Sequence, residues 1–237
     1  MGRTGKKHGV QRQRAELLIR QEIYLHVQKG RAALRRGHLR DAEEAFGRAL
    51  AAEPFHRAAL TGLGETHERR GDHAQACELY ERALAAGERT EHLLYALGNA
   101  CRGAQRREKA FRYYEELVEL NPSHVRALTR LGEACLERKD FQRAGDLFAQ
   151  ALGLDAHNIF ALRGLAAALR GRRDYRGAIP HYERLLRLEP GDHRVLLRLA
   201  EAYAHEGDGE SARRAYRLAL EIDPGNRYAL DGLSRLG

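Results

Sequence analysis

The chain contains no tryptophan, and aromatic residues make up only 7% of its 237 positions. It also lacks a long apolar run, since no stretch approaches the roughly 18 consecutive apolar residues of a membrane span. Leu17-Leu18-Ile19, which follows the basic N-terminus, is too short for the apolar part of a secretory signal. We therefore expect neither a membrane span nor a signal peptide.

Cysteine is scarce as well. The three cysteines, Cys77, Cys101 and Cys135, have no spacing typical of a metal site. An odd and sparse set is typical of a reducing compartment, so we expect a cytoplasmic protein. Cys101 and Cys135 fall on a predicted packed helix face, where we expect a small buried hydrophobe rather than a nucleophile.

Catalytic motifs are missing too. The sequence has no phosphate-binding loop ending in Gly-Lys-Ser/Thr and no His-Glu-x-x-His. Gly62-Leu63-Gly64 lies inside a predicted helix, so it cannot be a dinucleotide-binding fingerprint. The twelve histidines are scattered over different positions. We expect no enzyme activity, no catalytic residue, no metal and no cofactor.

Positive charge is concentrated at the N-terminus. The net charge is +8, and residues 1–22 hold six Lys/Arg against two Glu, a net +4. We expect residues 1–22 to be a basic, partly disordered arm, with disorder over 1–14 and a backward extension of the first helix over 15–22. The arm is either a solvated tail or an electrostatic contact to nucleic acid, an anionic membrane or an acidic partner.

What the sequence does have is a 34-residue period that repeats six times. In every unit an alanine is followed four positions later by an aromatic residue. The alanines are Ala42, Ala76, Ala110, Ala144, Ala178 and Ala212, and the aromatics are Phe46, Tyr80, Tyr114, Phe148, Tyr182 and Tyr216. A fixed period of this length indicates a repeat array rather than a single packed globule.

Each unit is predicted to form two helices, because apolar residues recur at i, i+3, i+4 and i+7 in both halves. An aspartate between the halves is a natural N-cap for the second helix, and proline ends four of the units. The N-cap candidates are Asp72, Asp140, Asp174 and Asp208. We place the units at 23–56, 57–90, 91–124, 125–158, 159–192 and 193–226. Residues 227–237 repeat the start of a unit and are expected to form a short capping helix.

The pattern resembles the tetratricopeptide repeat (TPR) family over residues 23–226, with Leu-Gly, Ala, aromatic, Ala and Pro at fixed offsets. The tryptophan common at the fourth position of the family pattern is replaced, in most units, by leucine. These leucines are Leu60, Leu94, Leu128, Leu162 and Leu196. The resemblance implies an all-α fold, a right-handed α-solenoid of helix-turn-helix repeats with a concave groove that holds peptides.

In that family a stripe on the first helix of each unit lines the groove, and units three to five stand out here. The predicted groove residues are Tyr95, Asn99, Arg102, Arg126, Arg130, Phe160 and Arg163. The asparagine would bind a peptide backbone, the arginines its carboxylates and the aromatics its apolar side chains. Small residues, Gly62 and Gly164 among them, would leave room for the ligand. An ordinary charged face explains part of the pattern equally well, since Arg130–Glu133 and Arg198–Glu201 are i, i+3 pairs.

The resemblance implies a non-enzymatic protein–protein interaction module: an adaptor, scaffold or co-chaperone that binds a peptide or helix, acidic in character, from a partner. One alternative is a nucleic-acid-associated protein acting through the basic arm, although the scarce aromatics give specific readout little support. Another is a self-assembling scaffold in which 227–237 or 1–22 of one copy enters the groove of the next.

Overall fold

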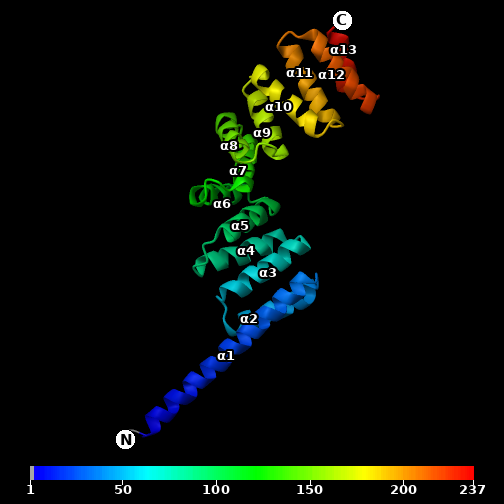
Figure 1. The fold of residues 1–237 in the computed structure, drawn as a ribbon. Helices are drawn as coiled ribbons and strands as arrows, with labels where there is room; N and C mark the ends of the chain where they lie inside the picture. The colour runs from blue at the N-terminus through cyan, green and yellow to red at the C-terminus, as the bar shows by residue number, and fades with distance from the viewer. Residues whose placement is uncertain (1–2) are drawn as a thin grey trace. The chain divides into compact units, whose positions relative to one another are not determined.

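The computed structural model describes residues 3–237, with side chains from Gln13 onwards, and contains thirteen helices and no strand over these residues (Figure 1). The helices belong to two compact units, residues 1–116 and 117–237. The fold class is the expected one, an all-α helical-repeat solenoid.

The first unit consists of consecutive antiparallel helices. They are α1 (Arg3–Arg35), α2 (Leu39–Ala52), α3 (Arg57–Arg70), α4 (His73–Ala85), α5 (Glu91–Gly103) and most of α6 (Arg107–Leu120). Each helix from α2 to α4 packs against the helices before and after it, and α1 also contacts α3. The second and later helix pairs lie within the expected 34-residue spans.

The second unit repeats this arrangement. Its helices are α7 (Val125–Glu137), α8 (Phe141–Leu154), α9 (Ile159–Gly171), α10 (Tyr175–Leu188), α11 (His193–His205), α12 (Gly209–Ile222) and α13 (Arg227–Arg235). The helix α13, where a cap was expected, packs against α12 and α11 and buries Ala229 completely. Arg213 also donates hydrogen bonds to the carbonyl oxygens of Leu236 and Gly237.

Aspartates start most of the second helices, as the sequence predicts. The Oδ1 atoms of Asp140, Asp174 and Asp208 accept hydrogen bonds from backbone N–H groups three residues on, at 3.1, 2.8 and 3.0 Å. Asp72 is different, because its side chain makes no cap hydrogen bond. Its Oδ2 lies 3.3 Å from Nδ1 of His67 instead.

Close approach of helices over an aromatic ring is the repeated packing motif. A Cβ built on Gly98 would lie 2.3 Å from Cε1 of Tyr114. A Cβ on Gly30, Gly64 or Gly132 would also lie too close to the aromatic ring of its own repeat. Small residues at these positions therefore permit the close approach. Gly62 and Gly164 differ from expectation, since their missing side chains make room for the rings of Phe46 and Phe148, not for a ligand.

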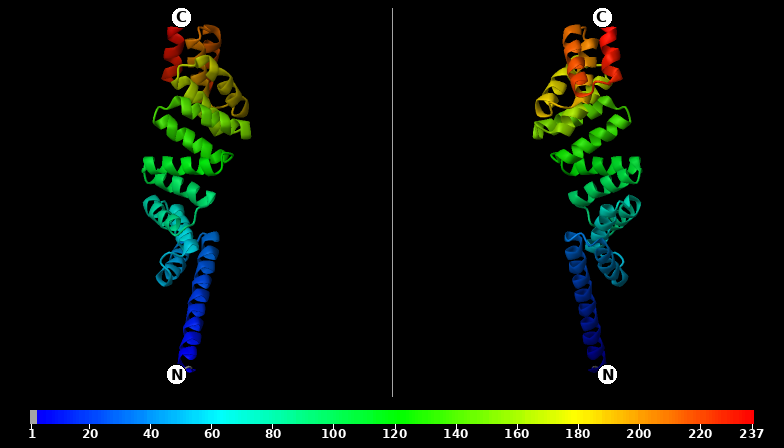
Figure 2. Two further views of the ribbon diagram at one scale, coloured as in Figure 1. Left: turned by 90° about the vertical axis from the view of Figure 1, so that its left-hand side faces the viewer. Right: turned by 90° about the vertical axis from the view of Figure 1, so that its right-hand side faces the viewer.

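Helix α1 begins earlier than the sequence analysis expected. It runs from Arg3, so residues 3–22 are helical where a partly disordered arm was predicted, and residues 1–2 lie outside the described part of the chain. Arg, Gln, Glu, Ala and Leu, all good helix formers, fill positions 11–18. The N-terminal part of α1 extends beyond α2 (Figure 2), and Leu17 and Leu18 are exposed there.

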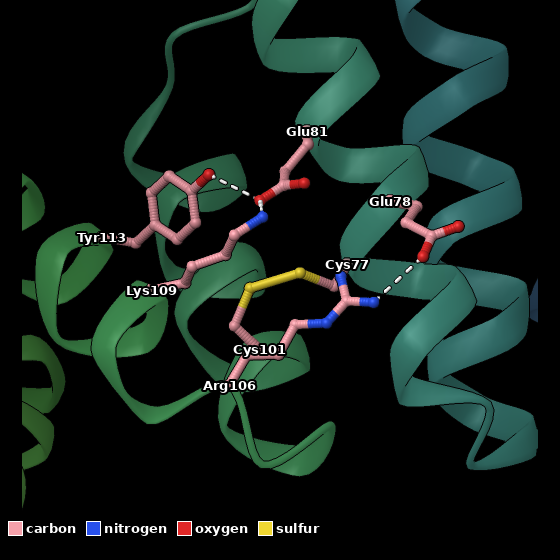
Figure 3. Close-up of a disulfide and its surroundings, with 7 residues drawn as sticks. All are labelled: Cys77, Glu78, Glu81, Cys101, Arg106, Lys109 and Tyr113. Atoms are coloured by element: carbon pink, nitrogen blue, oxygen red, sulfur yellow. Dashed lines mark hydrogen bonds and ion pairs between the residues drawn. A yellow bond between two sulfur atoms is a disulfide. The ribbon is translucent and has the colours of Figure 1, made fainter.

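A disulfide between Cys77 of α4 and Cys101 of α5 was not anticipated (Figure 3). Both residues are fully buried, as expected for Cys101, but the sulfurs are joined. The residues are 24 apart in sequence, yet successive helices bring their Cα atoms to 5.5 Å, within the range that a disulfide requires. Glu78 and Glu81 of α4 flank the bond, paired with Arg106 and Lys109 at 3.0 and 2.6 Å.

The packing over Phe148 gives a stability prediction. Gly164→Ala places a Cβ 2.2 Å from Cζ of Phe148, so the ring must shift, and we expect the free energy of unfolding to fall by about 1–3 kcal/mol. Gly153→Ala is the matched control, because Gly153 is an exposed helical glycine with nothing within 4 Å of the built Cβ. Its unfolding free energy should rise by about 0.5–1 kcal/mol. Urea titrations that show equal effects for both variants would contradict this packing.

The disulfide gives a second prediction. Alkylation of the denatured, unreduced protein should modify one cysteine per chain, and all three after reduction. Reduction should lower the free energy of unfolding by about 2–4 kcal/mol because the unfolded chain loses a cross-link. The double variant Cys77→Ala/Cys101→Ala should be insensitive to the reductant. Three modified cysteines before reduction would show that the bond does not form.

Candidate functional site

The second unit contains a pocket of about 770 Å³ among the helices that open its repeats. Helices α9, α11 and α13 supply most of its lining, and the rings of Tyr182 and Tyr216 reach it from α10 and α12. Each of these opening helices places its outward stripe on the same side, because the 34-residue period returns the chain to the same helix face. The pocket therefore combines side chains that lie far apart in sequence.

Arginine dominates the charge of the pocket. Five arginines and three acidic residues line it. The arginines are Arg163, Arg170, Arg194, Arg198 and Arg235, and the acids are Asp192, Glu201 and Asp231. Asp192 and Glu201 are already paired with arginines of the chain, so the pocket favours an anionic ligand.

Arg163 is positioned by the turn between α10 and α11. Its Nη2 lies 2.6 Å from Oε2 of Glu189 and 2.9 Å from Oδ2 of Asp192. The other oxygen of Asp192 accepts hydrogen bonds from the backbone N–H groups of Arg194 and Val195, and so caps α11. Arg163 is thus engaged by two carboxylates of its own chain, and a ligand would have to share or displace them.

Arg198 pairs with Glu201 at 3.1 Å, and Arg130 pairs with Glu133 at 2.8 Å on α7. Both are the i, i+3 pairs of the charged-face interpretation. Pairs of this kind stabilise a helix by only about 0.2–0.5 kcal/mol, so they hold the guanidinium groups weakly. By contrast, Arg194 and Arg235 have no carboxylate partner within the described residues, and both are exposed.

Aromatic side chains provide apolar area. Tyr228 of α13 lines the pocket and is 80% exposed, and Phe160 of α9 is 67% exposed. Tyr182 and Tyr216 lie beneath the surface, and burial raises the pKa of each phenol above its ordinary value. Both therefore remain protonated at neutral pH and add no negative charge to the pocket.

The seven predicted groove residues fall into both units. Tyr95, Asn99 and Arg102 lie on α5 of the first unit, whereas the other four lie on α7 and α9 of the second. Only Arg163 among the seven lines the pocket. Asn99 does not present a whole amide to a ligand, since its Oδ1 accepts a hydrogen bond from the Tyr114 hydroxyl at 2.8 Å. The Tyr95 ring is half-buried, 6.3 Å from that of Tyr114.

The sequence analysis missed Tyr228 and placed no emphasis on Arg194, Arg198 or Arg235. A signal for Tyr228 was present, because it lies 68 residues, two full periods, after Phe160. It was overlooked because residues 227–237 were treated only as a cap. Because units three to five were preferred, no groove residue was predicted in the sixth unit.

One further cluster has potential metal donors, which the cysteine spacing did not indicate. Ligand atoms of Cys77, Glu81 and Cys101 lie within 4.8 Å of one another. Because the two sulfurs are joined, neither is the thiolate that binds metals. The Glu81 carboxylate is also engaged, by Lys109 at 2.6 Å and by the Tyr113 hydroxyl at 3.1 Å (Figure 3). This arrangement does not fit a metal ion.

Among the described residues, no helix is both long and apolar enough to cross a bilayer.

Comparison with known proteins agrees with the repeat pattern. A tetratricopeptide repeat family model matches residues 27–89 and 95–159, and a second model of the same description matches 169–236. The sequence finds no match among curated proteins.

Several solved structures share the fold. A tetratricopeptide repeat protein from Parabacteroides merdae is 20% identical, with 91% of this chain and 99% of that chain covered and a TM-score of 0.68. PilF of Pseudomonas aeruginosa is 22% identical, with 92% and 99% covered and a TM-score of 0.69. YrrB, described as a TPR protein with an unusual peptide-binding site, is 19% identical, with 88% and 90% covered and a TM-score of 0.53.

Proposed function

Because the chain belongs to the tetratricopeptide repeat family, we propose that it binds a segment of a partner protein in the pocket between α9, α11 and α13. The observation that carries this proposal is the surplus of arginine beside the exposed ring of Tyr228 in one pocket of about 770 Å³. The protein acts as an adaptor, scaffold or co-chaperone, by binding rather than by catalysis. Its ligand is acidic.

The mechanism is capture by a preformed surface. Arg194 and Arg235 donate hydrogen bonds to carboxylates of the ligand, and each such charge-assisted bond contributes about 1.5–3 kcal/mol. Tyr228 supplies a large apolar area at a low cost in conformational entropy, since its side chain has few rotatable bonds. The helices carrying these residues are fixed by their packed neighbours, so little ordering accompanies binding.

The peptide-binding site described for YrrB supports a peptide as the ligand class, although that likeness extends only to the fold. The self-assembly alternative through residues 227–237 is disfavoured by α13, which is packed on α12 of its own chain and buries Ala229. The nucleic-acid alternative through residues 1–22 stays a prediction. It requires binding that weakens steeply with salt and disappears when residues 1–14 are deleted.

A cytoplasmic location also stays a prediction. The observation that weighs against it is the Cys77–Cys101 disulfide, since disulfides persist in oxidising compartments. Alkylation of thiols in intact, acid-quenched cells distinguishes the two cases.

The proposal predicts that Arg194→Ala/Arg235→Ala loses capture of the protein partner from native lysate, with affinity reduced at least about tenfold. The matched control is Arg176→Ala/Arg217→Ala, which removes two exposed arginines outside the pocket. Both variants should keep the circular dichroism and melting temperature of the parent. Equal capture by both variants would sink the proposal, as would capture abolished by nuclease or by deletion of residues 1–14.

A further inference from the structure

The first helices of the repeats in the second unit alternate in the type of side chain that they expose. At one repeat position, α7, α9, α11 and α13 carry Arg126, Phe160, Arg194 and Tyr228 in turn, each 34 residues after the last. All four side chains are exposed, the two aromatics at 67% and 80%. The order along the unit is therefore arginine, aromatic, arginine, aromatic.

The residues one helical turn later also alternate from helix to helix, in step with the first set. It holds Arg130, Gly164, Arg198 and Gly232 on the same four helices. The two arginines there make equivalent ion pairs, to Glu133 at 2.8 Å and to Glu201 at 3.1 Å. Helices α7 and α11 thus resemble each other, and so do α9 and α13, which gives the surface a period of 68 residues.

The glycines in this pattern each lie against an aromatic ring that fills the place of a side chain. A Cβ on Gly164 would lie 2.2 Å from Cζ of Phe148, and one on Gly232 would lie 2.4 Å from Cζ of Tyr216. At α13 the Tyr216 ring and Gly232 both line the pocket, beside Tyr228. Helix α13 therefore offers the exposed Tyr228 ring beside Gly232 and the Tyr216 ring, and α9 offers the exposed Phe160 ring, so each helix provides an apolar subsite. Helices α7 and α11 offer two guanidinium groups, which is an anionic-ligand subsite.

We propose that the ligand of the second unit is an extended peptide in which acidic and apolar residues alternate in the phase of this surface. This inference rests on the proposed function and specifies its ligand. Acidic side chains bind the arginines of α7 and α11, and aromatic or large aliphatic side chains lie against α9 and α13.

The spacing of the ligand residues follows from helix packing. Helix α7 packs against α9, and α11 against α13. Packed helices lie about 8–10 Å apart, and an extended chain advances about 3.3 Å per residue. Ligand residues opposite α7 and α9, and opposite α11 and α13, are therefore about three positions apart. The 34-residue period predicts the same step between α9 and α11, as in Glu-x-x-Phe-x-x-Glu-x-x-Phe.

Arginine beside aromatic rings is also a feature of surfaces that bind single-stranded nucleic acid. Here each arginine subsite carries its own carboxylate, Glu133 on α7 and Glu201 on α11, and Asp231 lines the pocket on α13. A phosphate backbone carries a charge on every nucleotide, so it cannot keep all of its charges away from these carboxylates. A peptide with separated acidic residues can place each one against a guanidinium group, so the surface favours peptide.

The experiment compares ligands of equal composition on the full-length protein by fluorescence polarisation at physiological salt. One labelled peptide carries the Glu-x-x-Phe-x-x-Glu-x-x-Phe pattern with Gly and Ser at x, and the other carries the same residues with both Glu first and both Phe last. A labelled oligothymidylate is the third probe. We expect the alternating peptide to bind at least tenfold more tightly than the grouped peptide and than the oligonucleotide.

Two variants locate the effect. Tyr228→Ala should weaken the alternating peptide at least fivefold and bring it close to the grouped peptide. Phe55→Ala is the control, because Phe55 is 63% exposed but lies in the first unit, and it should change nothing. Equal affinity for the two peptides, or tighter binding of the oligonucleotide, would overturn the alternating-ligand proposal.

Failure of this inference is separable from failure of the proposed function. If neither peptide binds but capture of a protein partner is still lost in Arg194→Ala/Arg235→Ala, the pocket binds a partner of another pattern and only the alternation is wrong. If neither peptide binds and that variant captures normally, both proposals are wrong.

Discussion

The structure depends on one steric constraint, the close approach of an opening helix to the aromatic ring of the neighbouring second helix. Gly98 over Tyr114 and Gly132 over Phe148 show the contact within a repeat, and Gly164 over Phe148 shows it between repeats. At each place a Cβ atom would collide with the ring. Glycine or alanine returns at the contact position every 34 residues, so within each unit the opening helices approach their rings in a similar way. The outward stripe of each opening helix is therefore set by packing beneath it.

This constraint separates the roles of neighbouring positions. The alanines and aromatics that recur in all six units are buried and account for the fold. The positions that face outwards are not constrained by packing, so their residue types differ from unit to unit. In the second unit they hold arginines and exposed rings, and most of the acids among them serve structural roles: Asp192 caps α11 and Glu201 pairs with Arg198. A cationic pocket with apolar walls is the result.

The fold could be predicted from the sequence because six copies of one pattern agree in register, and local errors do not accumulate. Asp140, Asp174 and Asp208 cap as expected, since capping depends on three or four adjacent residues. The start of α1 was predicted less well, because residues 3–22 lie outside the period and only local propensity acts on them.

The site could be predicted only in part, because the availability of a side chain depends on neighbours distant in sequence. The Asn99 Oδ1 accepts a hydrogen bond from the Tyr114 hydroxyl, and Arg163 forms ion pairs with Glu189 and Asp192. Cys77 and Cys101 meet only because successive helices bring them together. Tyr228 was recognisable only by comparing the last, incomplete repeat with the unit two periods earlier. The stripe as a ligand surface stays a prediction, whereas the pocket among α9, α11 and α13 could not be recognised without the structure.

The most direct test of the account is site-specific photo-cross-linking in living cells. A benzoylphenylalanine residue replaces Tyr228 in one strain and Phe55 in another, and cross-linked peptides are identified by mass spectrometry. The account predicts that position 228 cross-links to one discrete segment of a partner, with acidic residues within about three positions of the cross-linked residue, and that position 55 does not. Cross-links to that partner from position 55 alone, or from 228 to nucleic acid, would contradict it.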